Sequence, residues 1–216
     1  MKVPLQARLK KESHRRIAYA QDIIVKKVYE TFEKPVLHGG TGIWRCYSGK
    51  RFSEDLDFYL PKDKDKIKSL FENFERQGFK ILKKKISDNG IYSELEFENI
   101  KVRFEAIFKK INGSLCDYES SDANIISVYS LTKEEFIIEK ANTYLKRRKI
   151  RDLWDVFFLL KEMDSPQKIK ELANLIKNYK EPIDEDNLKV IILEGLIPSS
   201  KEMIAYIKRK WENKYI

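Results

Sequence analysis

A glycine pair between two short apolar runs is the feature that most restricts how this chain can fold. Residues 37–59 read LHGGTGIWRCYSGKRFSEDLDFY, so Gly39 and Gly40 follow directly on an apolar segment. The second apolar run carries Asp55 and Asp57, two positions apart. Alternate side chains of a strand share a face, so these two carboxylates point the same way. The segment therefore predicts a strand, a glycine turn, a short helix and a second strand.

The chemistry of this segment follows from its charges. Two carboxylates on one strand face repel each other unless a cation lies between them, and a hard divalent ion is the natural one. Glycines at a turn allow close approach of a phosphate, and the N-terminus of a helix favours anions. Together these features indicate nucleotide chemistry. The alternative is an acidic pair on a solvated strand face, which is the commoner origin of an isolated D-x-D.

These residues also resemble a known signature, and a second segment extends the resemblance. Gly39-Gly40-Thr41, with Arg51, Ser53, Glu54, Asp55 and Asp57, resembles the G-G-T … R-x-S-x-D-x-D motif of the nucleotidyltransferase AbiEii/AbiGii toxin family. Glu139-Lys140, Arg147 and Arg151-Asp152-Leu153-Trp154-Asp155 resemble the E-K … R-x-x-x-R-D-x-x-D segment of the same family. The two segments occur in the family's order and span over half of the chain.

The resemblance implies a fold and an activity. The fold is α+β, with a polymerase-β-like nucleotidyltransferase lobe built on a mixed sheet and a C-terminal helical lobe after it. The activity is metal-dependent transfer of a nucleoside monophosphate from an NTP to an acceptor. The biological role is that of a toxin in a toxin–antitoxin or phage-defence pair, which implies a cognate antitoxin as partner. Asp55 and Asp57 are then catalytic metal ligands, with Mg²⁺ or Mn²⁺ as cofactor.

A third carboxylate is expected on a neighbouring strand, because two metal ions need more ligands than one D-x-D supplies. Family members commonly have an acid, often aspartate, on the strand that corresponds to residues 100–108, so Glu105 is the candidate catalytic metal ligand. Alternation places Lys101, Arg103 and Glu105 on one strand face. The alternatives are a surface ion pair between Glu105 and one of these cations, or Glu96 as the third ligand.

The resemblance also assigns nucleotide binding, to residues of both segments. The nucleotide-binding candidates are Gly39, Gly40, Thr41, Arg51, Ser53, Lys140, Arg147 and Arg151, and Lys140 and Asp155 are also catalytic candidates. His38, beside the glycines, either contacts a phosphate or is a satisfied strand histidine.

The second segment combines charged residues with an apolar stretch, which restricts what those charges can do. If one helix ran through it, Lys140, Arg147, Arg151 and Asp155 would lie on one face. The residues after Arg151 are apolar all round, as in a buried helix, so its charges are costly unless they are paired or bind an anion. In one interpretation Lys140 and Arg147 bind phosphate opposite the glycine turn, while the aspartates orient Arg151 or a base. In the other, the charges form a structural Arg–Asp network.

The net charge of +9 makes a polyanion the expected partner. Basic residues cluster at positions 83–85, 146–151 and 208–210. Solvated faces of a lysine-rich protein are the alternative, and for 146–151, which lies inside the second motif, function is favoured. The acceptor is therefore expected to be an RNA, such as a tRNA end, or else a protein hydroxyl. A different class stays open: a nucleotide- or RNA-binding module with a degenerate transferase site.

The pattern along the chain predicts two lobes, residues 1–130 and 131–216. The first is expected to hold a helix ending before Pro35, a helix stopped by Gly78, and strands at 36–38, 79–86, 91–97, 100–108 and 125–129. The second is expected to be helical, beginning with a capping box at Thr132 and Glu135. The two cysteines are expected to be reduced. No apolar run could span a bilayer and the N-terminus lacks a secretory signal, which predicts a cytoplasmic protein without membrane partners.

Overall fold

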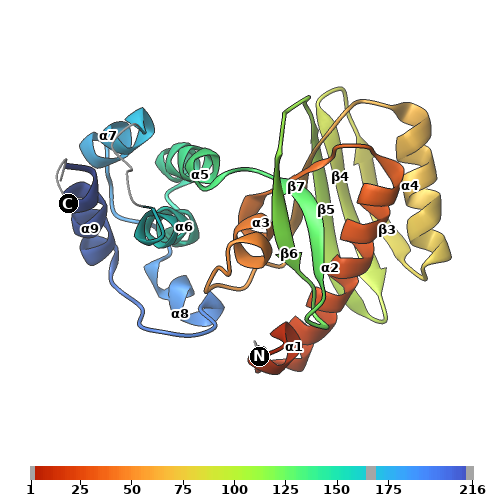
Figure 1. Cartoon of the computed structure of the whole chain (residues 1–216), viewed down its shortest axis with the longest axis horizontal. Helices are drawn as coiled ribbons and strands as arrows, with labels where there is room; N and C mark the ends of the chain where they lie inside the picture. The colour runs from red at the N-terminus through yellow and green to blue at the C-terminus, as the bar shows by residue number, and fades with distance from the viewer. Residues whose placement is uncertain (1–2, 164–168, 213–216) are drawn as a thin grey trace. The chain divides into compact units, whose positions relative to one another are not determined.

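The computed structural model describes residues 3–163 and 169–212 of the chain. The chain divides into two compact units (Figure 1). The first unit comprises Met1–Ser48 and Phe52–Leu131, and the second comprises Gly49–Arg51 and Thr132–Ile216. A short piece of the first motif therefore belongs to the second unit. The assignment of separate functions to residues 1–130 and 131–216 stays a prediction.

The first unit is built on one seven-stranded sheet, ordered β3-β4-β5-β2-β1-β7-β6. Its elements are α1 (Leu5–Arg8), α2 (Glu12–Thr31), β1 (Val36–His38), α3 (Gly39–Cys46), β2 (Leu56–Leu60), α4 (Lys64–Arg76), β3 (Lys80–Ile86), β4 (Gly90–Phe97), β5 (Ile100–Phe108), β6 (Ser114–Glu119) and β7 (Ile125–Ser130). β2 pairs with β5 in parallel and with β1 antiparallel, so the sheet is mixed. The predicted α+β class with a mixed sheet is confirmed.

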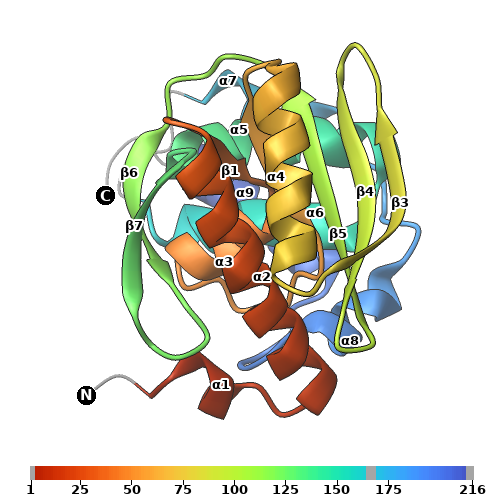
Figure 2. The same ribbon diagram turned by 90° about the vertical axis from the view of Figure 1, so that its right-hand side faces the viewer.

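Two helices, α2 and α4, lie along one face of this sheet (Figure 2). Period-two alternation in β2 and β5 directs Phe58 and Phe104 to that face, where both are fully buried. Phe71 and Phe74 of α4 contact Phe104, with ring centroids 6.3 and 5.6 Å away. Each such ring contributes about 1.5–3 kcal/mol by leaving water. This aromatic core fixes the register of β2 and β5, and hence the positions of the polar residues on the other face.

Two elements of this unit were missed by the sequence analysis. The helix α1 spans one turn, which is too short to show a helical period. The edge strand β6 has no apolar/polar alternation, because Leu115 is exposed and only Tyr118 is deeply buried among its apolar residues. It is formed by pairing along its full length with β7 rather than by its own pattern.

The described part of the second unit is helical, as predicted. Its elements are α5 (Lys133–Arg147), α6 (Ile150–Lys161), α7 (Lys170–Lys177), the 3-10 helix η2 (Glu185–Asn187), α8 (Leu188–Ile191) and α9 (Ser200–Glu212). The capping box at Thr132 and Glu135 is present at the start of α5. Ile192 forms an isolated antiparallel bridge with Arg51, which ties the segment Gly49–Arg51 to this unit.

The single helix considered for the second motif is wrong. Arg148 adopts a left-handed conformation with φ 48°, which ends α5, and α6 begins at Ile150. Lys140 and Arg147 therefore lie on α5, whereas Asp155 lies on α6. Among the described residues, no helix combines the length and the apolar character that a membrane span requires.

Candidate active site

Two carboxylates of the candidate site lie next to each other by strand register. Asp57 in β2 is directly opposite Glu105 in the parallel strand β5. Their neighbours Phe58 and Phe104 point into the core beneath α2 and α4, so both carboxylates lie on the opposite face of the sheet. Asp55 precedes β2, which begins at Leu56, so the D-x-D is only partly inside the strand.

The carboxylate of Asp57 packs against the first glycine of the pair. Gly39 has φ +71°, and a Cβ built on it would lie 2.0 Å from Asp57 Oδ2. Only glycine fits both this conformation and this contact. The turn between β1 and α3 therefore owes its glycine to the aspartate beside it. The first turn of α3, which begins at Gly39, is placed next to the carboxylate group.

Buried side chains hold the backbone that leads into β2. The Thr41 hydroxyl donates to the carbonyl oxygen of Asp55 at 2.5 Å, and Thr41 is fully buried. Gln21 of α2 donates to the carbonyl oxygens of Ser53 and Glu54 at 2.9 and 3.0 Å. The segment before β2 is thus anchored to two helices, which fixes where Asp55 leaves the backbone.

An arginine bridges two of the carboxylates. Arg103 Nη1 lies 3.3 Å from Asp55 Oδ2, and Arg103 Nε lies 3.8 Å from Glu105 Oε1. The surface pair considered for Glu105 is therefore present. Asp55 raises the pKa of Arg103, and burial together with the nearby Asp57 raises the pKa of Glu105 above its ordinary value. Burial disfavours the charged form of the Glu105 carboxyl group, and the negative charge of Asp57 adds to this effect.

The other candidate for the third carboxylate lies elsewhere on the sheet. Glu96 is opposite Lys101 in β5 rather than opposite Asp57, and its carboxylate is 3.6 Å from Lys80 Nζ. As the side chains stand, no three His, Cys, Asp or Glu residues in the described ranges form a group that could hold a metal ion. The arrangement is that of carboxylates held by an arginine.

His38 and the two cysteines of this unit pack against neighbouring side chains. The His38 ring stacks on that of Tyr59, with centroids 3.9 Å apart, and His38 is buried. Both cysteines are free. Burial and the neighbouring Cys116 raise the pKa of the Cys46 thiol to about 12, so it is protonated at neutral pH.

The second unit contains a buried ion-pair network that begins with Arg51. Arg51 donates to both carboxylate oxygens of Asp155, from Nε and Nη2, each at 2.6 Å. Both side chains are almost completely buried. Burial alone would lower the pKa of Arg51, but the Asp155 carboxylate outweighs this effect and the pKa is raised. Arg51 is thus a permanent cation.

The network continues through Lys140 to Arg147. Lys140 Nζ lies 3.6 Å from Asp155 Oδ2, and 3.9 Å from both Asp152 Oδ1 and Glu139 Oε1. Arg147 donates to both oxygens of Asp152 at 2.7 and 2.8 Å. The lysine lies further from its carboxylates than either arginine does. Lys140 therefore differs from the two arginines in having no short contact with a carboxylate of the described residues.

The expected partner of Asp155 is wrong. Asp155 pairs with Arg51 from the first motif, not with Arg151, for which no ion pair occurs among the described residues. The two motifs are thus joined by a bidentate contact across 104 positions of sequence. Sequence spacing cannot reveal such a contact. The only available signal was that a buried aspartate on an apolar helix needs a cation from somewhere in the chain.

The comparison with known families decides the identity of this fold and its motifs. The model of the nucleotidyl transferase AbiEii toxin family, a type IV toxin–antitoxin system, matches residues 29–205. The chain belongs to this family. As an AbiEii family member it is a nucleotidyltransferase of a toxin–antitoxin family, as the two motifs predicted. No curated protein matches the sequence closely enough to add to this assignment.

Solved structures support the AbiEii fold. The nucleotidyltransferase toxin MenT4 from Mycobacterium tuberculosis superposes with a TM-score of 0.66 at 15% identity, over 93% of this chain and 83% of MenT4. JHP933 from Helicobacter pylori superposes with a TM-score of 0.63 at 20% identity, over 94% of this chain and 91% of JHP933. A putative nucleotidyltransferase from H. pylori gives 0.63 at 20% identity, over 94% of both chains. At these identities the likeness shows the fold.

Proposed function

We propose that this AbiEii family member transfers a nucleoside monophosphate from an NTP to an RNA acceptor, with the help of a divalent metal ion. The observation that supports this most directly is the packing of Asp57 against Gly39. It puts a carboxylate beside the glycine turn and the first turn of α3, with Glu105 opposite in the sheet. A glycine backbone beside these carboxylates also allows a phosphate to approach closely.

The donor chemistry fits a hard divalent cation. Asp55, Asp57 and Glu105 offer carboxylate oxygens, the ligands that Mg²⁺ and Mn²⁺ prefer. Burial, and after it the negative charge of Asp57, raises the pKa of Glu105, and a bound cation would relieve the part that comes from the negative charge. When bound, the ion supplies charge neutralisation at the phosphates and activation of the acceptor hydroxyl.

The chain's own residues bind and orient the nucleotide in this proposal. Backbone N–H groups of Gly39, Gly40 and Thr41 at the start of α3 bind phosphate oxygens. The Thr41 hydroxyl is already used by Asp55, so its part is to hold the backbone. Ser53, anchored by Gln21, is a further nucleotide-binding candidate in this unit.

In the second unit the cations differ in what they can do. Arg51 and Arg147 are each committed to an aspartate through two short hydrogen bonds, so they act by holding Asp155 and Asp152. Lys140 is more loosely held, which makes it the better candidate for a direct contact with phosphate. Arg151 is the other nucleotide-binding candidate, and Asp155 positions Lys140.

The experiment is a labelling reaction. The purified protein is incubated with each α-labelled NTP in turn, with Mg²⁺ or Mn²⁺, and with total cellular RNA or total protein. We expect RNA to become labelled with one NTP or a few, and labelling to stop when the metal is chelated. Asp57→Asn should abolish labelling without lowering the melting temperature.

Each other outcome rejects a defined part of the proposal. Label on protein but not on RNA replaces the RNA acceptor with a protein hydroxyl. Absence of label on either acceptor, with NTP or RNA still bound, favours a binding module with a degenerate site. Labelling that survives chelation rejects the metal. Co-purification with a protein that blocks labelling would identify the cognate antitoxin that family membership suggests.

A further inference from the structure

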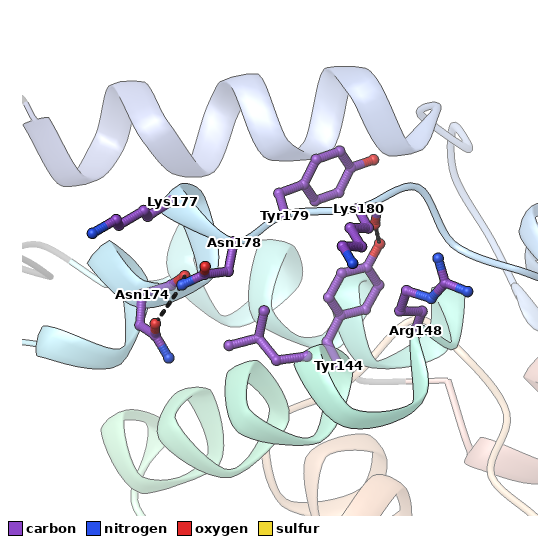
Figure 3. A pocket seen from close by; sticks show the side chains of 8 residues that line it. Tyr144, Arg148, Asn174, Lys177, Asn178, Tyr179 and Lys180 are labelled. Atoms are coloured by element: carbon purple, nitrogen blue, oxygen red, sulfur yellow. Dashed lines mark hydrogen bonds between the residues drawn. The ribbon is translucent and has the colours of Figure 1, made fainter.

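The second unit contains an open pocket that none of the motifs covers. Its volume is about 760 Å³, and it lies where the ends of α5 and α7 meet the segment after α7. It is lined by Tyr144, Leu145, Arg148, Asn174, Lys177, Asn178, Tyr179 and Lys180 (Figure 3). The lining residues therefore include three cations, two amides and two phenols, but no carboxylate.

These cations differ from their neighbours. Arg147 and Lys149, on either side of Arg148, are paired with Asp152 and Asp184. For Arg148, Lys177 and Lys180, no carboxylate lies within 4.0 Å in the part of the chain that the structure describes. All three are exposed. Three cations around one hollow repel each other, so the pocket carries a local excess of positive charge that an anion would relieve.

The lining is held in place by contacts that leave these charges available. The Tyr144 hydroxyl donates to the Lys180 carbonyl oxygen at 2.6 Å, and the Tyr144 and Tyr179 rings stack with an interplanar angle of 6° (Figure 3). Asn178 Nδ2 donates to Asn174 Oδ1 at 2.7 Å. The left-handed Arg148 is fixed through its carbonyl oxygen, which accepts from the Ile183 N–H. The backbone around the cations is therefore ordered before any ligand arrives.

We propose that this pocket binds phosphate groups along the backbone of the acceptor RNA, which rests on the proposed function. A free nucleotide carries the same phosphate chemistry. However, small-molecule sites are mostly apolar and bury most of their ligand, whereas the three cations here are exposed. Exposed cations without carboxylate partners suit a long polyanion, which gains from each phosphate neutralised through counterion release.

A structural explanation for two of the cations exists, and it makes a different prediction. Arg148 and Lys177 lie at the C-terminal ends of α5 and α7, where a cation compensates the helix dipole. Lys180 lies beyond α7, where no dipole requires it. If compensation were the whole role, neutralising these residues would lower the melting temperature and leave RNA affinity unchanged.

The test compares two triple variants of the full chain that change its charge equally. The pocket variant carries Arg148→Gln, Lys177→Gln and Lys180→Gln. The control carries Lys189→Gln, Lys201→Gln and Lys208→Gln, which are exposed lysines of the same unit that already pair with carboxylates. Binding of fluorescein-labelled transfer RNA is followed by anisotropy across a salt series, and binding of an NTP is measured in parallel.

We expect the pocket variant to lose about tenfold or more in RNA affinity at low salt. The plot of log K against log salt should become less steep by roughly two, since three phosphate contacts are lost and each contributes about 0.7 on a single strand. KM for RNA should rise while kcat and NTP affinity stay unchanged. Arg148→Lys should largely retain binding, because it keeps the charge.

Two results would overturn the inference. Equal slopes for the pocket variant and the control would show that the pocket is only a solvated basic face. Loss of NTP affinity without loss of RNA affinity would make it a nucleotide site. In either case, wild-type labelling of RNA would still support the proposed function, so the two proposals fail separately.

Discussion

The carboxylates of the sheet and those of α6 differ in how deeply they are buried and in how many cations pair with them. Asp152 and Asp155 are buried, and three cations surround the two of them at distances of 2.6–3.9 Å. Asp55 and Glu105 keep 23% and 40% of their side chains exposed and share Arg103, with Asp57 adjoining. The buried acids satisfy a requirement of folding. The acids of the sheet are only partly buried, and two of them share one arginine.

The need for a partner separates buried charges from partly buried ones. Buried charges must be paired at short range, because leaving one unpaired costs several kcal/mol. Carboxylates on a partly exposed strand face do not have to be paired at short range, yet the repulsion between them destabilises the fold slightly. The divalent cation that we propose as cofactor would account for their grouping.

The largest effect should come from Asp57. Asp57→Asn removes one charge from a repelling group, so the free energy of unfolding should stay unchanged or increase. Transfer should fall by about a thousandfold, since a metal ion supplies several kcal/mol of transition-state stabilisation. Labelling rates and urea denaturation of the same preparation measure both quantities.

Asp88→Asn is the matched control, because it removes the same charge from a side chain of this unit that is almost fully exposed. It should transfer like wild type. If Asp57→Asn also transferred like wild type, the carboxylates of the sheet would have no catalytic role, and the contrast with the buried acids of α6 would be rejected.

The second largest effect should be on stability, and in the other unit. Asp155→Asn breaks the bidentate pair with Arg51 and leaves a buried guanidinium without its counter-charge. The free energy of unfolding should fall by about 3–5 kcal/mol, as for other buried pairs that lose one partner. Denaturation followed by circular dichroism would measure the loss. Asp186→Asn, in the same unit and 94% exposed, should cost little.

A different result for Asp155→Asn would be informative. A protein that melts like wild type but cannot transfer would move Asp155 from the structural network to the catalytic step. The contrast between the fully buried acids of α6 and the partly buried acids of the sheet would then not hold for this residue.

The third effect is smaller and concerns Arg103. This arginine neutralises Asp55 and Glu105 in the structure, so it competes with any metal ion for the same oxygens. Arg103→Gln should tighten Mn²⁺ binding by roughly two- to fivefold, since a partly exposed pair is worth about 1 kcal/mol or less. Titration calorimetry without nucleotide measures the change. Lys101→Gln, on the same face of β5, serves as the control, and equal affinities for both variants would exclude the competition.

The same contrast explains what the sequence could and could not reveal. The strand–glycine–helix–strand segment and the core helices were predictable, because Phe58, Phe104 and the glycines act through local period and backbone conformation. The contact between Gly39 and Asp57 was not, since it depends on how β1 and β2 pair. The Arg51–Asp155 pair and the break at Arg148 also escaped prediction, because no local pattern determines a long-range partner or a left-handed residue that is not glycine.

The smallest predicted effect is a pH dependence carried by Glu105. Its pKa is raised above the ordinary value of 4.5 by burial and by Asp57. The folded state therefore holds this proton more tightly than the unfolded state does. The free energy of unfolding should fall as the pH rises from about 4.5 through the raised pKa, with the contribution of Glu105 fully present only below this window.

Because the side chain is 40% exposed, solvent screening should limit this contribution to less than about 1 kcal/mol. Glu105→Gln should remove it, giving a flatter profile of stability against pH than wild type between pH 4 and 7, by roughly that amount. Urea denaturation at several pH values measures both profiles. Mg²⁺ should oppose this fall in wild type, because it stabilises the protein more at high pH, where Glu105 is ionised, than at low pH. Identical profiles for the two proteins, with and without Mg²⁺, would mean that Glu105 lies too far from Asp57 to sense its charge, and would remove it from the carboxylate group.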